Sequence, residues 1–307
     1  MDALINIDNR AIAKLIELVS SAIGTLYRPR QIRKEAEAKA YAIKTIEKAK
    51  TDAFLERRFA ELNLEDRVVE RIVAKEIRRQ ENIDSIVQMA AQNLLEEDSV
   101  SQKPVDVDWA TRFFEYAQDI TKEEMKVLWA KILAKEVKTP SSFSLRTLDV
   151  LRNITSEEAE TFEKVGKFVM YESDCFIYNN SEVLERFDIK FSDIVFLRDC
   201  GILMSTDFIV KNYSSDSKEN SSAYVYCGNY CIRMTIPKNH REISIPVHLL
   251  TRVGQELLTL IEIEGNLDYM RSWRDAIKKE GPNVTVEYAK WMIEGGKIVY
   301  TVPFVEL

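Results

Sequence analysis

The sequence predicts a mostly helical α+β protein, and three observations lead to this fold class. Only 9 glycines and 7 prolines interrupt 307 residues, which favours long helices. The chain is 46% hydrophobic and 30% charged, so charged helix faces can surround a sizeable core. From about residue 176, short β-rich segments alternate with turn signals. We expect a helical arm over residues 1–98, a compact helical block over 105–171, and a winged-helix-like α+β module over 172–307.

The composition limits the classes of protein to which this chain can belong. Its formal net charge of -7 disfavours wholesale coating of nucleic acid. No segment approaches the roughly 20 apolar residues of a membrane span, and the first eight residues lack the basic start of a secretory signal. Four cysteines in a chain of this length do not make a disulfide framework, so we expect a reducing cytoplasm.

The expected arm starts with an amphipathic helix and continues as two long helical runs. Apolar residues recur at helical spacing between residues 9 and 27. Residues 30–62 lack glycine and proline, and Asn63 can cap a second run to about residue 97. The two similar lengths predict an antiparallel hairpin or coiled-coil stalk, with one continuous helix as the alternative. A hairpin should bury its apolar side chains against its partner run, another subunit or both, and these side chains are Val69, Ile72, Val73 and Ile83.

A basic segment directly follows the amphipathic helix. Residues 28–58 carry ten bases and five acids, a net charge of +5. Its first bases are Arg28, Arg30, Arg33 and Lys34, which form a candidate membrane or partner surface together with the helix. The favoured alternative is that the helix packs on the core and the bases are solvated.

The helical block has recognisable helix starts. Thr121 with Glu124, and Thr155 with Glu158, have the spacing of capping boxes. Ser144 is a further candidate N-cap, before the run from Leu145 to Leu151. We expect the helix that starts after Thr155 to continue towards residue 171.

The C-terminal third mixes short helices with strands. Ser181 and Ser192 can start short helices, and Thr251 and Asn266 can start two later ones. Strands are expected over residues 202–211, 223–227, 230–237 and 242–249. Gly228-Asn229 is a two-residue hairpin signal. Residues 284–293 and 297–302 predict a terminal β-hairpin, with a helix over 285–294 as the alternative.

The order of elements in this module resembles a winged-helix protein. Two short helices precede strands, and Leu250-Thr-Arg-Val-Gly-Gln-Glu-Leu257 has a pattern common where a wing strand enters a closing helix. The expected second helix would then read DNA. Residues 181–200, however, contain five acids and three bases, a net charge of -2, whereas phosphate contacts need clustered bases. We therefore favour a protein-docking module over a nucleic-acid reader.

The sequence contains no recognisable catalytic, cofactor or metal site. The glycines never form a phosphate-binding loop, and His240 and His248 have no recognisable nucleophile context. Cys175, Cys200, Cys227 and Cys231 could supply four thiolates for zinc. A two-residue turn, however, places Cys227 and Cys231 on opposite sides of the hairpin, so we expect no zinc site.

Several segments resemble a known family. They are Phe113-Phe-Glu-Tyr-Ala-Gln-Asp-Ile120, Trp129-Ala-Lys-Ile-Leu-Ala-Lys-Glu-Val137, Pro140-Ser-Ser-Phe-Ser-Leu-Arg-Thr-Leu-Asp-Val-Leu151 and the N-terminal Gly24-Thr-Leu-Tyr-Arg-Pro-Arg-Gln-Ile-Arg-Lys-Glu-Ala36. Together they resemble a bacterial domain-of-unknown-function family, the one numbered 2806, and more loosely the abortive-infection proteins. The resemblance covers most of residues 9–155 and implies no catalytic residues. It implies at most a role in defence against phage.

The sequence thus favours a non-enzymatic interaction or oligomerisation protein that docks a second copy or a protein partner through its arm. The alternative is a nucleic-acid-binding regulator that uses the winged-helix-like region. A third hypothesis is an enzyme with an unrecognised carboxylate site. No cofactor is expected.

Overall fold

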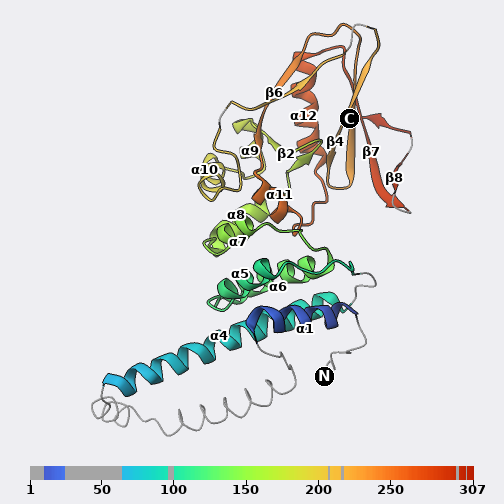
Figure 1. The fold of residues 1–307 in the computed structure, drawn as a ribbon. Helices are drawn as coiled ribbons and strands as arrows, with labels where there is room; N and C mark the ends of the chain where they lie inside the picture. Colours follow the sequence, from blue (N-terminus) through green and yellow to red (C-terminus); the bar gives the residue numbers. More distant parts are fainter. Residues whose placement is uncertain are drawn as a thin grey trace. The chain divides into compact units, whose positions relative to one another are not determined.

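A computed structural model describes residues 10–24, 64–95, 100–206, 208–215, 218–294, 297–301 and 303–307. The chain forms two compact units, Met1–Arg152 and Asn153–Leu307. Together they form an α+β protein (Figure 1). The three-part division expected from sequence stays a prediction. None of the described helices is long and apolar enough to cross a membrane.

The described part of the first unit is helical. Its elements are α1 (Arg10–Ile23), α4 (Leu64–Leu94), α5 (Val107–Ala117), α6 (Glu123–Lys138) and α7 (Leu145–Leu151). The amphipathic helix predicted over residues 9–27 is α1, and Gly24 follows it with a φ of 71°. A positive φ suits glycine because it has no Cβ. The predicted run over residues 30–62 lies outside the described residues, as does Asn63.

The core of this unit joins the arm to the helical block. The apolar face of α1 is buried, and α1 packs on α5 and α6. The second half of α4 also packs on α6 and buries Ile83, Ile86 and Leu94. Between these helices, the rings of Trp109 and Trp129 both lie 5.1 Å from the ring of Phe113. The helices α1, α5 and α6 and the second half of α4 therefore share one core.

The helix starts test the predicted caps. Ser144 accepts a hydrogen bond from Thr147 N, and Thr155 and Glu158 form the predicted capping box of α8 (Ser156–Gly166). The box predicted at Thr121 is wrong. The N-cap of α6 is Lys122, whose backbone is extended (φ -78°, ψ 131°) and which forms no side-chain cap. Thr121 is therefore one residue too early to cap the helix.

The second unit combines five helices with nine antiparallel strands in the described part of the chain. The other helices are α9 (Ser181–Arg186), α10 (Phe191–Asp199), α11 (Arg252–Leu258) and α12 (Leu267–Glu280). The strands are β1 (Met170–Tyr171), β2 (Cys175–Tyr178), β3 (Val210–Tyr213), β4 (Ser221–Cys227), β5 (Tyr230–Ile236), β6 (Ile243–Leu249), β7 (Thr285–Glu294), β8 (Lys297–Tyr300) and β9 (Val305–Glu306). Their order is β3-β6-β2-β1-β4-β5-β7-β8, and β9 also pairs with β7.

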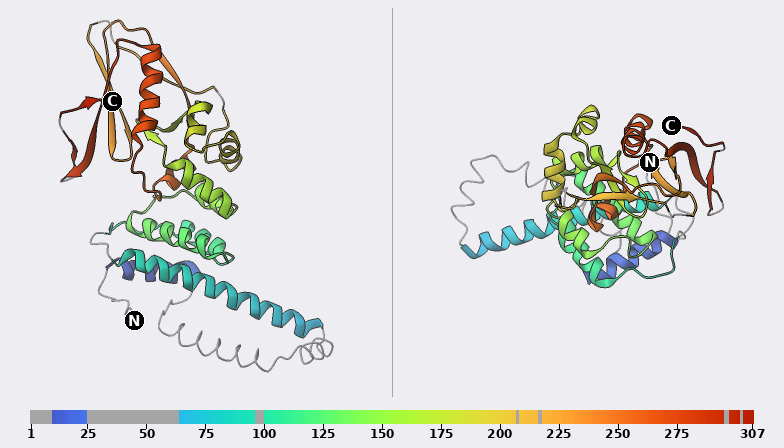
Figure 2. Two further views of the ribbon diagram at one scale, coloured as in Figure 1. Left: turned by 180° about the vertical axis from the view of Figure 1, so that it is seen from behind. Right: turned by 90° about the horizontal axis from the view of Figure 1, so that it is seen from above.

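The helix α12 provides much of the core of this unit and runs alongside the sheet (Figures 1 and 2). Trp273 of α12 is fully buried, with its ring 5.3 Å from that of Phe176 on β2 and 6.3 Å from that of Tyr213 on β3. Tyr269, also fully buried, accepts a hydrogen bond from Tyr178 N through its hydroxyl (2.8 Å). The start of this helix is the predicted one, because Asn266 accepts from Tyr269 N.

Most predicted strands are confirmed, but two regions differ. The Gly228-Asn229 turn joins β4 to β5, and β7 and β8 form the terminal hairpin, so the helical alternative for 285–294 is wrong. The strand predicted over residues 202–211 is reduced to a bridge between Leu203 and Leu250 and the start of β3. The helix expected to continue towards residue 171 ends at Gly166, because β1 begins at Met170.

Candidate functional site

The basic residues proposed from sequence, Arg28, Arg30, Arg33 and Lys34, lie outside the described residues. The helix before them is held firmly within the first unit. Lys14 Nζ donates to the carbonyl oxygens of Ser101, Lys103 and Val137 at 2.7–3.0 Å. Burial lowers the pKa of Lys14, while the nearby Glu136 carboxylate opposes this shift. The apolar face of α1 is therefore part of the core, as in the favoured alternative.

The cysteines lie in surroundings that keep their thiols protonated. The register pairs Cys227 with Tyr230 and Cys231 with Tyr226, which places the two cysteines on opposite sides of the hairpin as predicted. Burial raises the pKa of each to about 11. Burial and the Glu158 carboxylate raise the pKa of Cys200 to about 12. The described residues contain no group of three or more His, Cys, Asp or Glu side chains placed to hold a metal ion.

The Leu250–Leu257 motif has a structural role in the second unit. Thr251 caps α11 by accepting from Gly254 N, and its hydroxyl donates to Gly201 O (2.6 Å). A Cβ on Gly254 would lie 2.4 Å from Ile202 O, so only glycine allows this close approach. The motif thus attaches the start of α11 to the segment after α10.

The first candidate interaction surface is an apolar stripe on α4, formed by Val69, Ile72 and Val73. These side chains are 51–58% exposed, whereas Ile83 is buried. Burial of the stripe against the run over residues 30–62 or against another subunit stays a prediction. Spacings of three and four residues place the stripe on the helical face that further along packs on α6. In both views of Figure 2 the beginning of α4 projects beyond α1, α5 and α6.

The charges around the α4 stripe have both signs. Arg67, Glu70 and Arg71 precede or interleave with it, and Lys75 and Glu76 follow it. Further along, Arg79 binds both carboxylate oxygens of Asp119, just beyond α5, at 2.9 and 3.1 Å. This ion pair lies close to the point where α4 enters the core of the unit.

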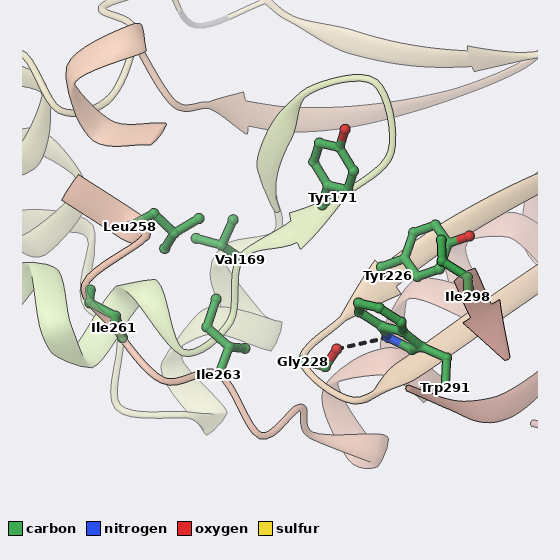
Figure 3. Close-up of a pocket in the computed structure, with 9 residues that line it drawn as sticks. All are labelled: Val169, Tyr171, Tyr226, Gly228, Leu258, Ile261, Ile263, Trp291 and Ile298. Carbon is green, nitrogen blue, oxygen red and sulfur yellow. Dashed lines mark hydrogen bonds between the residues drawn. The ribbon is translucent and has the colours of Figure 1, made fainter. Parts of the chain in front are cut away.

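The second candidate surface is a pocket of about 320 Å³ in the second unit (Figure 3). Its lining residues come from far-apart parts of the chain and are Val169, Tyr171, Tyr226, Gly228, Leu258, Ile261, Ile263, Trp291 and Ile298. None of these side chains is acidic or basic. Burial and a hydrogen bond to Tyr300 raise the pKa of Tyr226 above its ordinary value, so its hydroxyl is neutral at physiological pH.

Sequence reasoning found the α4 stripe and missed the pocket. The stripe appears as helical periodicity within five residues, so the sequence shows it directly. The pocket joins residues up to 129 positions apart, Val169 and Ile298, and contains no local motif. Only strand order and register bring them together.

The comparisons with known proteins give one match. A family model described as "Protein of unknown function (DUF2806)" matches residues 66–273, more than half of the chain. No curated protein matches, and no solved structure matches.

Proposed function

We propose that this chain, which belongs to the DUF2806 family of proteins of unknown function, is a non-enzymatic interaction protein that self-associates through α4. The observation behind this proposal is the change from exposed to buried apolar side chains along one face of α4. The same face of α4 is buried from Ile83 onwards and exposed at Val69, Ile72 and Val73. Aliphatic side chains exposed in a row are a marker of protein contact surfaces.

A second copy of the chain is the occupant that we propose for this stripe. Charges of both signs flank it, so the surface can complement itself across a two-fold axis. An arm that projects from its own core also leaves room for two copies to lie side by side as paired helices. The competing occupant is the chain's own segment of residues 30–62, which the sequence predicts to be helical.

Co-purification of two differently tagged copies tests this proposal. Val73→Lys places a charge in the stripe, and Ala74→Lys places the same charge on the exposed opposite face of α4. We expect wild-type and Ala74→Lys copies to co-purify and Val73→Lys copies to separate. Wild-type copies that never co-purify would favour the competing occupant and refute self-association.

The alternative function is a nucleic-acid-binding regulator with a winged-helix-like module. In its favour, α8, β2, α9, α10, Leu203 and β6 occur along the chain in the winged-helix order, and β2 pairs with β6. Three further strands, β3, β4 and β5, lie between Leu203 and β6. Against nucleic acid, the exposed residues of α10 include Phe191 and Val195, and Asp193 is paired with Lys164. Binding to generic DNA or RNA that weakens steeply with salt would favour this alternative.

The cellular setting is a separate part of the proposal. We place the protein in the cytoplasm because its cysteines are free thiols. The looser resemblance to abortive-infection proteins suggests anti-phage defence in a bacterial cell. Phage plating on cells that produce wild-type or Val73→Lys protein tests this role, and equal plating with and without the wild-type protein would rule it out. Flotation with anionic vesicles tests the membrane role of residues 9–34.

A further inference from the structure

We propose that the pocket in the second unit binds a neutral, planar aromatic small molecule of one or two rings that carries a hydrogen-bond acceptor. This inference is independent of self-association through α4. The pocket volume of about 320 Å³ is at the lower end of the range for small-molecule sites, which limits the ligand to a small ring system.

One wall of the pocket is aromatic and held in place. The Trp291 indole donates through Nε1 to Gly228 O (2.9 Å), which orients its ring. The Tyr226 ring lies 5.3 Å from the Trp291 ring at 74°, and the Tyr171 ring lies 6.5 Å from that of Tyr226. Aromatic rings in such tilted arrangements accept a further ring by stacking or edge contact.

The other wall is aliphatic, as Figure 3 shows. Val169, Leu258, Ile261 and Ile263 lie together on the side away from Trp291. An aromatic ring that contacts the rings of Trp291 or Tyr226 with one face would turn its other face to this aliphatic wall. The aromatic wall therefore favours a planar aromatic ligand.

The polar group at the Ile298 end of the pocket is the Tyr226 hydroxyl, which points towards Ile298 in Figure 3 and pairs with Tyr300 behind the lining. Tyr226 Oη and Tyr300 Oη lie 2.7 Å apart, and either can be the donor. Two hydroxyls that share one hydrogen bond retain one further hydrogen, for which the Cys231 sulfur is a weak acceptor within the protein. A carbonyl or ring nitrogen on the ligand is a stronger acceptor for this hydrogen than the sulfur.

The charge of the lining decides between neutral and ionic ligands. No lining residue carries a charge, and the high pKa of Tyr226 excludes a phenolate there at neutral pH. A buried anion or cation would have no counter-charge among these residues, and burial of an unpaired charge is costly. A neutral ligand avoids this cost.

The test uses 2-quinolinone, a neutral planar bicycle with one carbonyl, on the full-length protein. The readout is the indole N–H signals of protein with ¹⁵N-labelled tryptophan. Trp109, Trp129 and Trp273 are buried in the two cores, so only the Trp291 signal should shift. Tyr226→Phe should weaken binding about five- to tenfold, the loss of one hydrogen bond. Tyr224→Phe, two residues earlier on the same strand, should leave it unchanged.

Two further comparisons define the ligand class. Octahydro-2-quinolinone, which keeps the carbonyl but loses planarity, and quinoline-2-carboxylate, which adds a charge, should each bind at least tenfold more weakly. Ile298→Glu at the rim should weaken binding, and Val299→Glu on the neighbouring exposed residue should not. The proposal is overturned if 2-quinolinone leaves the Trp291 signal unshifted, or if all three compounds bind equally.

Discussion

The backbone N–H of Phe143 donates a 3.1 Å hydrogen bond to Glu136 Oε2, and this bond joins the two segments that most resemble the family. The other oxygen, Oε1, accepts from Ser141 N at 2.5 Å. Glu136 is only 1% exposed, and Ser141 has a φ of 72°. The carboxylate thus stabilises the turn between α6 and α7. This structural role accounts for a buried acidic residue within the family-like segment.

Glu136→Gln should destabilise the protein by about 1.5–3 kcal/mol, the usual value of hydrogen bonds to a charged group. The new amide NH₂ would face a backbone donor. Chemical denaturation measures the free energy of unfolding, and Glu124→Gln, at an exposed position of the same helix, is the matched control. Equal stability of both variants would contradict this role of Glu136.

Thr155→Ala should lower the free energy of unfolding by about 1 kcal/mol, because it removes the acceptor for Glu158 N. Thr121→Ala should have little effect, because α6 starts without a side-chain cap. Thermal melts of both variants measure the two effects, and a larger loss for Thr121→Ala would contradict a start of α6 without a side-chain cap.

The thiols should react slowly in the native protein. With pKa values of about 11 for Cys227 and Cys231 and about 12 for Cys200, roughly one thiol in a thousand or fewer is ionised at pH 8. Burial also raises the pKa of Cys175. A thiol-disulfide reagent should titrate all four cysteines rapidly only after unfolding. Rapid reaction of native protein at Cys200 would disprove the assigned surroundings.

The Arg79–Asp119 ion pair should make stability depend on pH in acid. The hydrogen bond from Arg79 holds the pKa of Asp119 below its ordinary value. The pKa of Asp119 is lower in the folded protein than its unfolded value of about 4, so the ionised Asp119 stabilises the fold above about pH 4. This contribution is lost as the pH falls through the folded pKa. Arg79→Gln should therefore lower the free energy of unfolding only slightly at pH 7, because the pair is partly exposed. Its difference from wild type should shrink below pH 4, and a constant difference across the acid range would contradict this.

Local features were the most predictable from sequence. Ser144, Thr155, Thr251 and Asn266 cap helices as expected, because a cap depends on three or four neighbouring residues. The short strands β1 and β2 were not predicted, because two to four residues carry little signal and their partners are distant. The pocket depends on those pairings, so sequence reasoning could not find it. The apolar face of α4 was found, but periodicity cannot say which part of it is covered.

Sedimentation velocity over a range of concentrations tests self-association through the α4 stripe most directly. We predict that wild-type protein and Ala74→Lys sediment as an oligomer that dissociates on dilution, and that Val73→Lys sediments as a folded monomer. Ala74→Lys shows whether dissociation depends on a charge within the stripe or on any added charge on α4. A wild-type protein that is monomeric at every concentration, or a Val73→Lys variant that associates like wild type, would contradict the proposal.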